Sequence, residues 1–224
     1  MLFHSIQGGG YVAPKFVTNF TFIASTGTTG TTTATVPSSS QVGDLCVIVA
    51  VGVVPSPAPP SGWTQVSITN GSLFCHRIVY KILTSGDIGT SVVLNGSGNV
   101  GSYGATCSLV FRGNIPISAV HISSLNTQGE TNTTVSSVKD TSLYPPSNII
   151  IATKSDYNIY YSTYSTAISG SFWNGGISKT VSLQGLAISY EIQNSSNTNR
   201  TVSPANASSS NYQHMHSFVL NAAG

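Results

Sequence analysis

Charged side chains are scarce in this sequence. Lysine and arginine contribute 8 of the 224 residues and aspartate and glutamate contribute 6, so charged residues make up 6% of the chain and the net charge is +2. The basic residues occur singly and form no patch of the kind that neutralises nucleic-acid phosphates. We therefore expect no nucleic-acid partner, and we expect solubility to come from uncharged Ser, Thr and Asn.

Long apolar runs are also missing. No stretch of about 18 apolar residues is present to span a membrane. The N-terminus, MLFHSIQGGGYVAPKF, lacks the basic start and the long apolar core of a signal peptide. Synthesis in a cytoplasm and no membrane partner are expected. The three cysteines, Cys46, Cys75 and Cys107, lie within apolar runs at irregular spacing, which predicts buried thiols rather than a disulfide framework.

Motifs that carry catalysis are absent. The sequence has no nucleophile elbow, phosphate loop or dinucleotide fingerprint, and its acidic residues are isolated from one another. Asp44 and Asp87 lie in predicted turns, where aspartate is expected for backbone reasons. A carboxylate pair for glycoside hydrolysis would have to assemble across loops. We expect no catalytic residue and no cofactor, and thus a protein that is not an enzyme.

One local pattern, His214-Met-His216, has the spacing of a metal site. Two residues apart on a strand, the imidazoles share a face, and a His-x-His from each of three symmetry-related chains would bind a metal ion. The alternative is a half-buried row shared with Tyr212, Phe218 and Leu220, in which the histidines occupy the wetter end. We favour the row and expect no metal; His214 and His216 are the residues that a metal site would use.

Period-two alternation of apolar residues recurs along the chain, whereas no helical pattern persists for three turns. The sequence therefore predicts an all-β fold. About ten strands separated by Gly, Pro and Asn turns favour an antiparallel β-sandwich, jelly-roll-like in topology. The strand containing Arg77 and Lys81 is predicted to turn those two side chains to solvent. The predicted inward rows are Phe16, Phe20 and Phe22; Phe74, His76, Ile78, Tyr80 and Ile82; Ala105, Cys107, Leu109 and Phe111; and Leu186, Ile188, Tyr190 and Ile192.

The stretch from Leu45 to Val54 is apolar at every position except Gly52. Such a run predicts a central strand covered on both faces, either by the chain itself or by a neighbouring subunit. The prolines of residues 55–60 lack N–H donors, so the strand must end there. Trp63 is then expected to fold back over the open end of the sandwich.

Composition does not change along the chain, which favours a single sandwich domain over residues 14–224. A short N-terminal arm, residues 1–13, precedes it and contains the hinge Gly8-Gly-Gly10. A second distinctive segment, Tyr157 to Gly176, is rich in aromatic and small polar residues, which suit a glycan site, a protein interface or simple loop packing. The predicted partner-interface residues are Leu2, Phe3, Tyr11, Tyr160, Tyr161, Tyr164, Phe172 and Trp173.

Four stretches together resemble a known class of protein. They are Val36-Pro37, Gly43-Asp-Leu45, Pro59-Pro-Ser-Gly-Trp-Thr64 and Tyr80-Lys-Ile82. In this succession the chain resembles β-sandwich virion proteins of tailed bacteriophages, which serve as head decoration (cement) proteins or as tail and fibre modules. The resemblance covers roughly residues 31–112 and brings no catalytic residues with it.

The resemblance implies a structural role on a virus particle assembled in the host cytoplasm. We expect a capsid decoration protein that binds the major capsid protein on the outer shell surface and forms a homo-oligomer, a trimer being usual in such settings. The alternative is a tail or fibre protein that binds host surface glycans through the Tyr157 to Gly176 segment.

Overall fold

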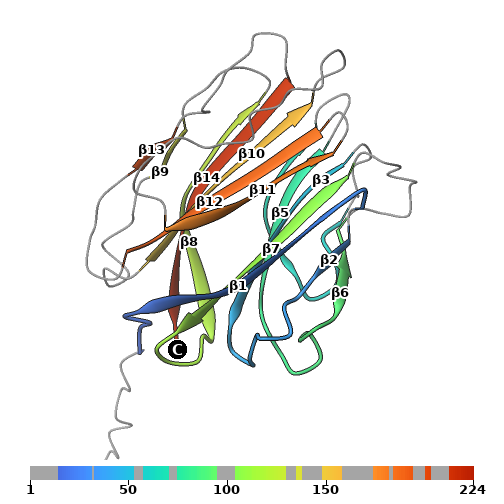
Figure 1. The fold of residues 1–224 in the computed structure, drawn as a ribbon. Coiled ribbons are helices and arrows are strands. Elements are labelled where there is room, and N and C mark those ends of the chain that lie inside the picture. Colours follow the sequence, from blue (N-terminus) through green and yellow to red (C-terminus); the bar gives the residue numbers. More distant parts are fainter. Residues whose placement is uncertain are drawn as a thin grey trace, which may run out of the picture.

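The structure is a computed structural model (Figure 1) and describes residues 15–31, 33–52, 58–70, 75–94, 104–129, 135–137, 148–157, 174–181, 184–193, 200–202 and 212–224. Among these residues all regular secondary structure is β-strand, with no helix, and paired strands run antiparallel. The predicted all-β antiparallel sandwich is therefore confirmed. The jelly-roll detail stays a prediction, as does the division into an arm and one domain.

Two five-stranded sheets face each other, and each is built from one half of the chain (Figure 1). Sheet 1 has the order β1 (Phe20–Thr29), β7 (Ala105–Gly113), β3 (Leu45–Gly52), β5 (Cys75–Ile82) and β4 (Thr64–Asn70). Sheet 2 has the order β11 (Gly175–Val181), β12 (Gln184–Gln193), β10 (Asn148–Tyr157), β14 (Tyr212–Ala223) and β8 (Ala119–Gly129). Residues 114–118 connect the two sheets.

The main core lies between the two sheets and includes residues of the predicted inward rows together with residues of β3 and β14. It includes Leu45, Val47, Val49 and Val51 from β3, Ile78 from β5, Cys107, Leu109 and Phe111 from β7, Leu186, Ile188 and Tyr190 from β12, and Phe218 and Leu220 from β14. On the first row the prediction fails at Phe16, which is only half-buried, while Val17 is in the core. Tyr190 stacks on Phe22 with ring centroids 4.7 Å apart and meets Phe111 edge-on at 5.3 Å. On β1 the strict alternation ends at a β-bulge between Phe22 and Ala24.

The outer face of sheet 1 is also covered, by a layer that the chain itself supplies. The short strands β2 (Thr33–Thr35) and β6 (Ser91–Val93) pair with each other on this face (Figure 1). All of β3 is buried, which confirms the predicted two-sided strand for its residues 45–52. Trp63 is buried as expected, but it packs against this outer face rather than over an open end. The apolar residues of the outer layer are Ala34, Val36, Cys46, Ile48, Ala50, Trp63, Val79, Leu83, Val92, Leu94 and Val110.

Arg77 does not reach solvent, contrary to the prediction. Its side chain is fully buried beneath the outer layer, and its Nη1 donates to the carbonyl oxygens of Ala58 at 2.7 Å and Leu94 at 2.8 Å. Desolvation by burial lowers the pKa of Arg77. Alternation correctly placed Arg77 on the outer face of sheet 1, but that face is not solvated because β2 and β6 cover it.

Hydroxyl groups attach β2 to sheet 1. The carbonyl oxygen of Thr35 accepts hydrogen bonds from Thr26 Oγ1 and Ser108 Oγ, at 2.7 and 2.9 Å. The carbonyl oxygen of Thr33 accepts in the same way from Thr28 Oγ1 and Thr106 Oγ1, at 3.0 and 2.9 Å. The carbonyl groups of alternate residues point to the same side of a strand. Thr33 and Thr35 therefore both direct their carbonyl oxygens to the edge of β2 that faces away from β6, and these hydroxyl groups supply hydrogen-bond donors to that edge.

On the outer side of sheet 2, β9 (Val135–Ser137) pairs with β13 (Arg200–Val202), and β9 packs against β8 and β14. The outward-facing Ser217, Val219 and Asn221 of β14 are buried. Across the described residues there is no helix with the length and hydropathy needed to traverse a bilayer.

Candidate functional site

The residues predicted to form a partner interface lie outside the described part of the chain. They are Leu2, Phe3 and Tyr11 in the arm, and Tyr160, Tyr161, Tyr164, Phe172 and Trp173 in the aromatic segment. Their role, whether in protein contacts, glycan binding or loop packing, stays a prediction. Asn174, near the end of the aromatic segment, is fixed to β12: its N–H donates to the Tyr190 carbonyl at 2.9 Å, and its Oδ1 accepts from the Ile192 N–H at 2.6 Å.

His216 lies inside the sandwich, so the expectation that it occupies a wetter end of its strand is wrong. Its side chain is fully buried, as is that of His76 on the opposite sheet. The two rings meet edge-on, with centroids 4.4 Å apart and planes at 78°, because sheet 1 presents His76 directly to β14. The described side chains contain no group of three or more His, Cys, Asp or Glu suited to a metal ion. The His214 side chain is outside the described set, and metal binding by His214 and His216 stays a prediction.

The three cysteines are buried free thiols, as predicted. Desolvation raises the pKa of Cys75 to about 11 and also raises the pKa of Cys46. Cys75 and Cys46 are therefore protonated at neutral pH and carry no reactive thiolate.

Asp44 and Arg112 form an ion pair at one end of sheet 1. Arg112 Nε donates to Oδ1 of Asp44 and Nη2 donates to Oδ2, both at 2.8 Å. The Asp44 side chain is 2% exposed and that of Arg112 is 33% exposed. The Gln41 N–H also donates to the Asp44 carboxylate at 2.7 Å. The hydrogen bonds between Arg112 and Asp44 raise the pKa of the Arg112 guanidinium and hold both groups in one orientation.

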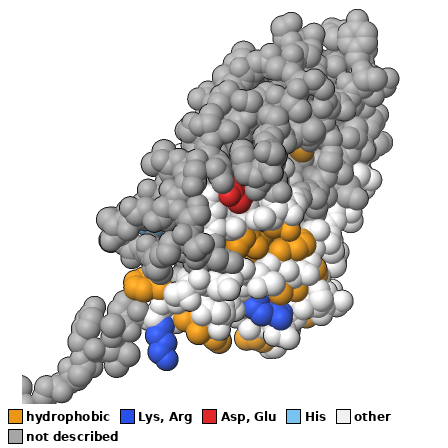
Figure 2. All heavy atoms as spheres, turned by 60° about the vertical axis from the view of Figure 1, so that its left-hand side comes forward, with side chains coloured by type: hydrophobic (Ala, Val, Ile, Leu, Met, Phe, Trp, Pro, Cys, Tyr) orange, Lys and Arg blue, Asp and Glu red, His pale blue; other side chains and the backbone are white. Residues whose placement is uncertain are grey.

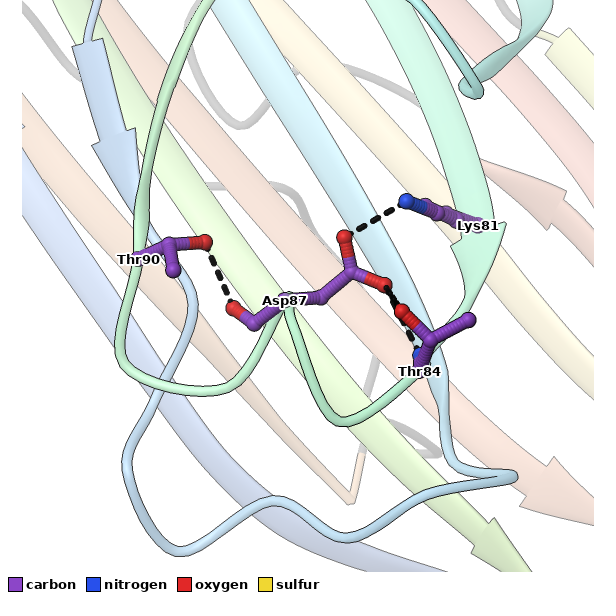
Figure 3. Close-up of polar contacts among 4 residues, drawn as sticks. All are labelled: Lys81, Thr84, Asp87 and Thr90. Atoms are coloured by element: carbon purple, nitrogen blue, oxygen red, sulfur yellow. Dashed lines mark hydrogen bonds and ion pairs between the residues drawn. The ribbon is translucent and has the colours of Figure 1, made fainter.

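A second ion pair braces the turn after β5 (Figure 3). Asp87 accepts from Lys81 Nζ at 2.5 Å, from the Thr84 N–H at 2.8 Å and from Thr84 Oγ1 at 2.6 Å. The Asp87 carbonyl oxygen accepts in turn from Thr90 Oγ1 at 2.6 Å. Burial raises the pKa of Asp87, but the hydrogen bonds from Lys81 and Thr84 lower it more, so the net shift is downward. Asp87 is thus engaged in fixing its own turn.

A hollow of about 140 Å³ opens at the surface beside the Asp44–Arg112 pair. Two segments line it: residues 41–44, in the loop that precedes β3, and residues 112–116, which comprise the end of β7 and the start of the connection to sheet 2. Val42, in the first loop, is 63% exposed, the highest value among the exposed large hydrophobic residues of the described chain. Ile115 and Pro116 provide apolar wall on the other side. The hollow therefore combines an apolar lining with a guanidinium that is already neutralised.

The backbone of Gly43 fixes the position of the two walls of the hollow. Its φ of 86° lies in the left-handed region, and a Cβ there would come within 3.3 Å of Pro116 Cβ. Its N–H donates to the Leu83 carbonyl at 2.9 Å, and its carbonyl accepts from the Ile117 N–H at 3.2 Å. The hollow is therefore preformed by backbone contacts rather than by side chains that must reorganise.

Both ends of the described chain lie near the hollow. The Lys15 carbonyl accepts from the Gly224 N–H at 2.8 Å. Asn114, which lines the hollow, accepts at Oδ1 from the N–H groups of Thr18 and Asn19, at 3.0 and 3.2 Å. In Figure 2 most of the described hydrophobic side chains in view, and the basic ones, lie below the acidic group.

Asp44 and Asp87 lie in separate loops and each forms its own ion pair, so the fold does not bring these two carboxylates together. No protein-family model, curated protein or solved structure matches the chain. The sequence reasoning missed the hollow. The turn signals at Gly43-Asp44 and Gly113-Asn114 mark its two loops, but only the pairing of β3 with β7 brings them together.

Proposed function

We propose that the chain is a non-enzymatic structural protein of a tailed-bacteriophage virion. In this role it is a decoration or cement protein that binds the major capsid protein on the outer surface of the head. It acts as a homo-oligomer, a trimer being usual in such settings, and stabilises the shell.

The observation that carries the proposal is the spatial grouping of the residues that resemble phage virion proteins. Val36 and Trp63, from two of the four stretches, share the outer core layer. Gly43 and Asp44 exchange backbone hydrogen bonds with Leu83, directly after the Tyr80–Ile82 stretch. A Cβ at Gly62 would lie 3.4 Å from Lys81 Nζ. The four stretches thus form one structural unit, which supports a shared architecture rather than a shared active site.

The ion pairs of Asp44 and Asp87 also support a structural role. Asp44 and Asp87 each fix a loop through an ion pair and backbone N–H groups. For Asp87, the hydrogen bonds from Lys81 and Thr84 stabilise the carboxylate and lower its pKa, which makes it a poor general base. The two-sided burial of β3 adds rigidity, which suits a protein that clamps a shell.

Capsids prepared without the chain provide the test. A ligand that binds only the assembled shell stabilises it by about 2.7 kcal/mol per site at a concentration of 100 Kd. Added purified chain should co-sediment with the capsids to saturation and raise the temperature at which they rupture. A variant that lacks residues 1–10 should co-sediment less well while keeping the circular dichroism of the full chain. A full chain that neither co-sediments nor changes the rupture temperature would contradict the proposal.

A further inference from the structure

The described chain begins beside the hollow. Lys15, its first residue, is bonded through its carbonyl to Gly224. Gly224 in turn packs against the hollow's wall, since a Cβ at this glycine would lie 2.5 Å from Ile115 Cδ1. Lys15, where the described chain begins, therefore lies close to the rim of the hollow. Fully extended, 13 residues reach at most about 45 Å, which is enough to span from one domain to another.

The lining of the hollow defines what it can hold. Val42, Ile115 and Pro116 offer apolar contact, and the guanidinium of Arg112 is neutralised by Asp44. Because Nε and Nη2 of Arg112 face Asp44, the remaining nitrogen, Nη1, is directed away from the pair. A charged occupant would gain little from this neutral pair. The matching ligand is an uncharged polypeptide segment with apolar side chains and a main-chain carbonyl to accept from Arg112.

The N-terminal arm has this chemistry. Residues 1–13, MLFHSIQGGGYVA, contain no Lys, Arg, Asp or Glu. The apolar Leu2, Phe3 and Ile6 precede the triple glycine of residues 8–10 in the sequence. The exposed Val42 beside the hollow offers apolar contact, which suits such an apolar segment better than it suits a charged partner.

We propose that the arm of one copy of the chain occupies the hollow of a neighbouring copy, with an apolar side chain against Val42 and a main-chain carbonyl on Arg112. The inference deepens the oligomeric part of the proposed function and does not require the capsid. The contact between copies can therefore be tested on the purified chain alone. If that contact is absent, capsid binding is still tested separately, by co-sedimentation.

Cysteine cross-linking between differently tagged copies tests the contact. Chains carrying Leu2→Cys are mixed with chains carrying Val42→Cys and oxidised with oxidised glutathione; the native thiols are buried, which keeps background pairing low. The matched control is Val93→Cys, which is 58% exposed against 63% for Val42 and does not line the hollow. We expect a mixed disulfide that carries both tags from the Leu2→Cys and Val42→Cys chains, at least tenfold above the control.

A second measurement does not depend on thiol geometry. Val42→Asp places a carboxylate on the rim of the hollow, and Val93→Asp makes the same change away from it. Analytical ultracentrifugation should show at least tenfold weaker self-association for Val42→Asp and no change for Val93→Asp, with equal thermal stability of the two variants. The proposal would be overturned by a mixed disulfide no stronger than the Val93→Cys control, or by equal self-association of the two aspartate variants.

Discussion

Replacing Arg112 should destabilise the protein more than replacing Asp44, although two hydrogen bonds join the two side chains to each other. The asymmetry follows from exposure, which is 2% for the Asp44 side chain and 33% for that of Arg112. Without Arg112, a buried carboxylate loses the cation that compensates it. Without Asp44, the partly exposed guanidinium of Arg112 can form hydrogen bonds with water in its present position.

The magnitudes follow from the same geometry. Removing one partner of a buried pair costs about 3 to 5 kcal/mol, and the partial exposure of Arg112 places Arg112→Met at about 3 kcal/mol. Asp44→Asn keeps an oxygen that can accept from the Gln41 N–H, so a loss of about 1.5 kcal/mol is expected. The double variant no longer contains a buried charge and should lose about 2 kcal/mol, well short of the sum of the single losses.

Urea unfolding monitored by circular dichroism measures all three variants, provided that the slope of the unfolding free energy against urea is unchanged. Two results would refute the reasoning. One is an Asp44→Asn loss as large as that of Arg112→Met; the other is a double-variant loss equal to the sum of the two.

Three further substitutions test other parts of the sandwich. Asp87→Asn should lower the melting temperature at pH 7. The deficit should shrink as pH falls below the unfolded pKa of about 3.9, because the stabilisation is present above that pKa and is lost as pH falls through the lower folded pKa. A deficit independent of pH would contradict this. Thr106→Val removes the hydroxyl that bonds Thr33 and should cost about 1 to 2 kcal/mol in urea unfolding, whereas a neutral result would mean that the hydroxyl contacts do not hold β2. Trp63→Ala should cost about 3 to 5 kcal/mol in the same assay, and a loss below about 1 kcal/mol would show that the outer layer contributes little.

The inward rows were predictable because alternation is a local property of a strand. Leu186, Ile188 and Tyr190 could be assigned to the core from their spacing alone. The outer layer was not predictable in this way. Its strands β2 and β6 have only three residues each, too few for a pattern, so Arg77 and the hydroxyls of β7 looked like a solvated face.

The hollow depends on long-range pairing. Asp44 and Arg112 are 68 residues apart in sequence, and they meet because Leu45 pairs with Phe111 where β3 runs beside β7. Nothing in the sequence around either residue specifies that register. The edge-on contact of His76 with His216 is of the same kind, since it depends on how the two sheets face each other.

Immunogold electron microscopy of intact virus particles, with antibody raised against the purified chain, tests the proposed function most directly. A capsid decoration protein predicts gold distributed over the whole head. Gold confined to the tail would contradict the decoration role and favour the alternative, a tail or fibre protein that binds host glycans. Particles without gold would contradict a virion role altogether.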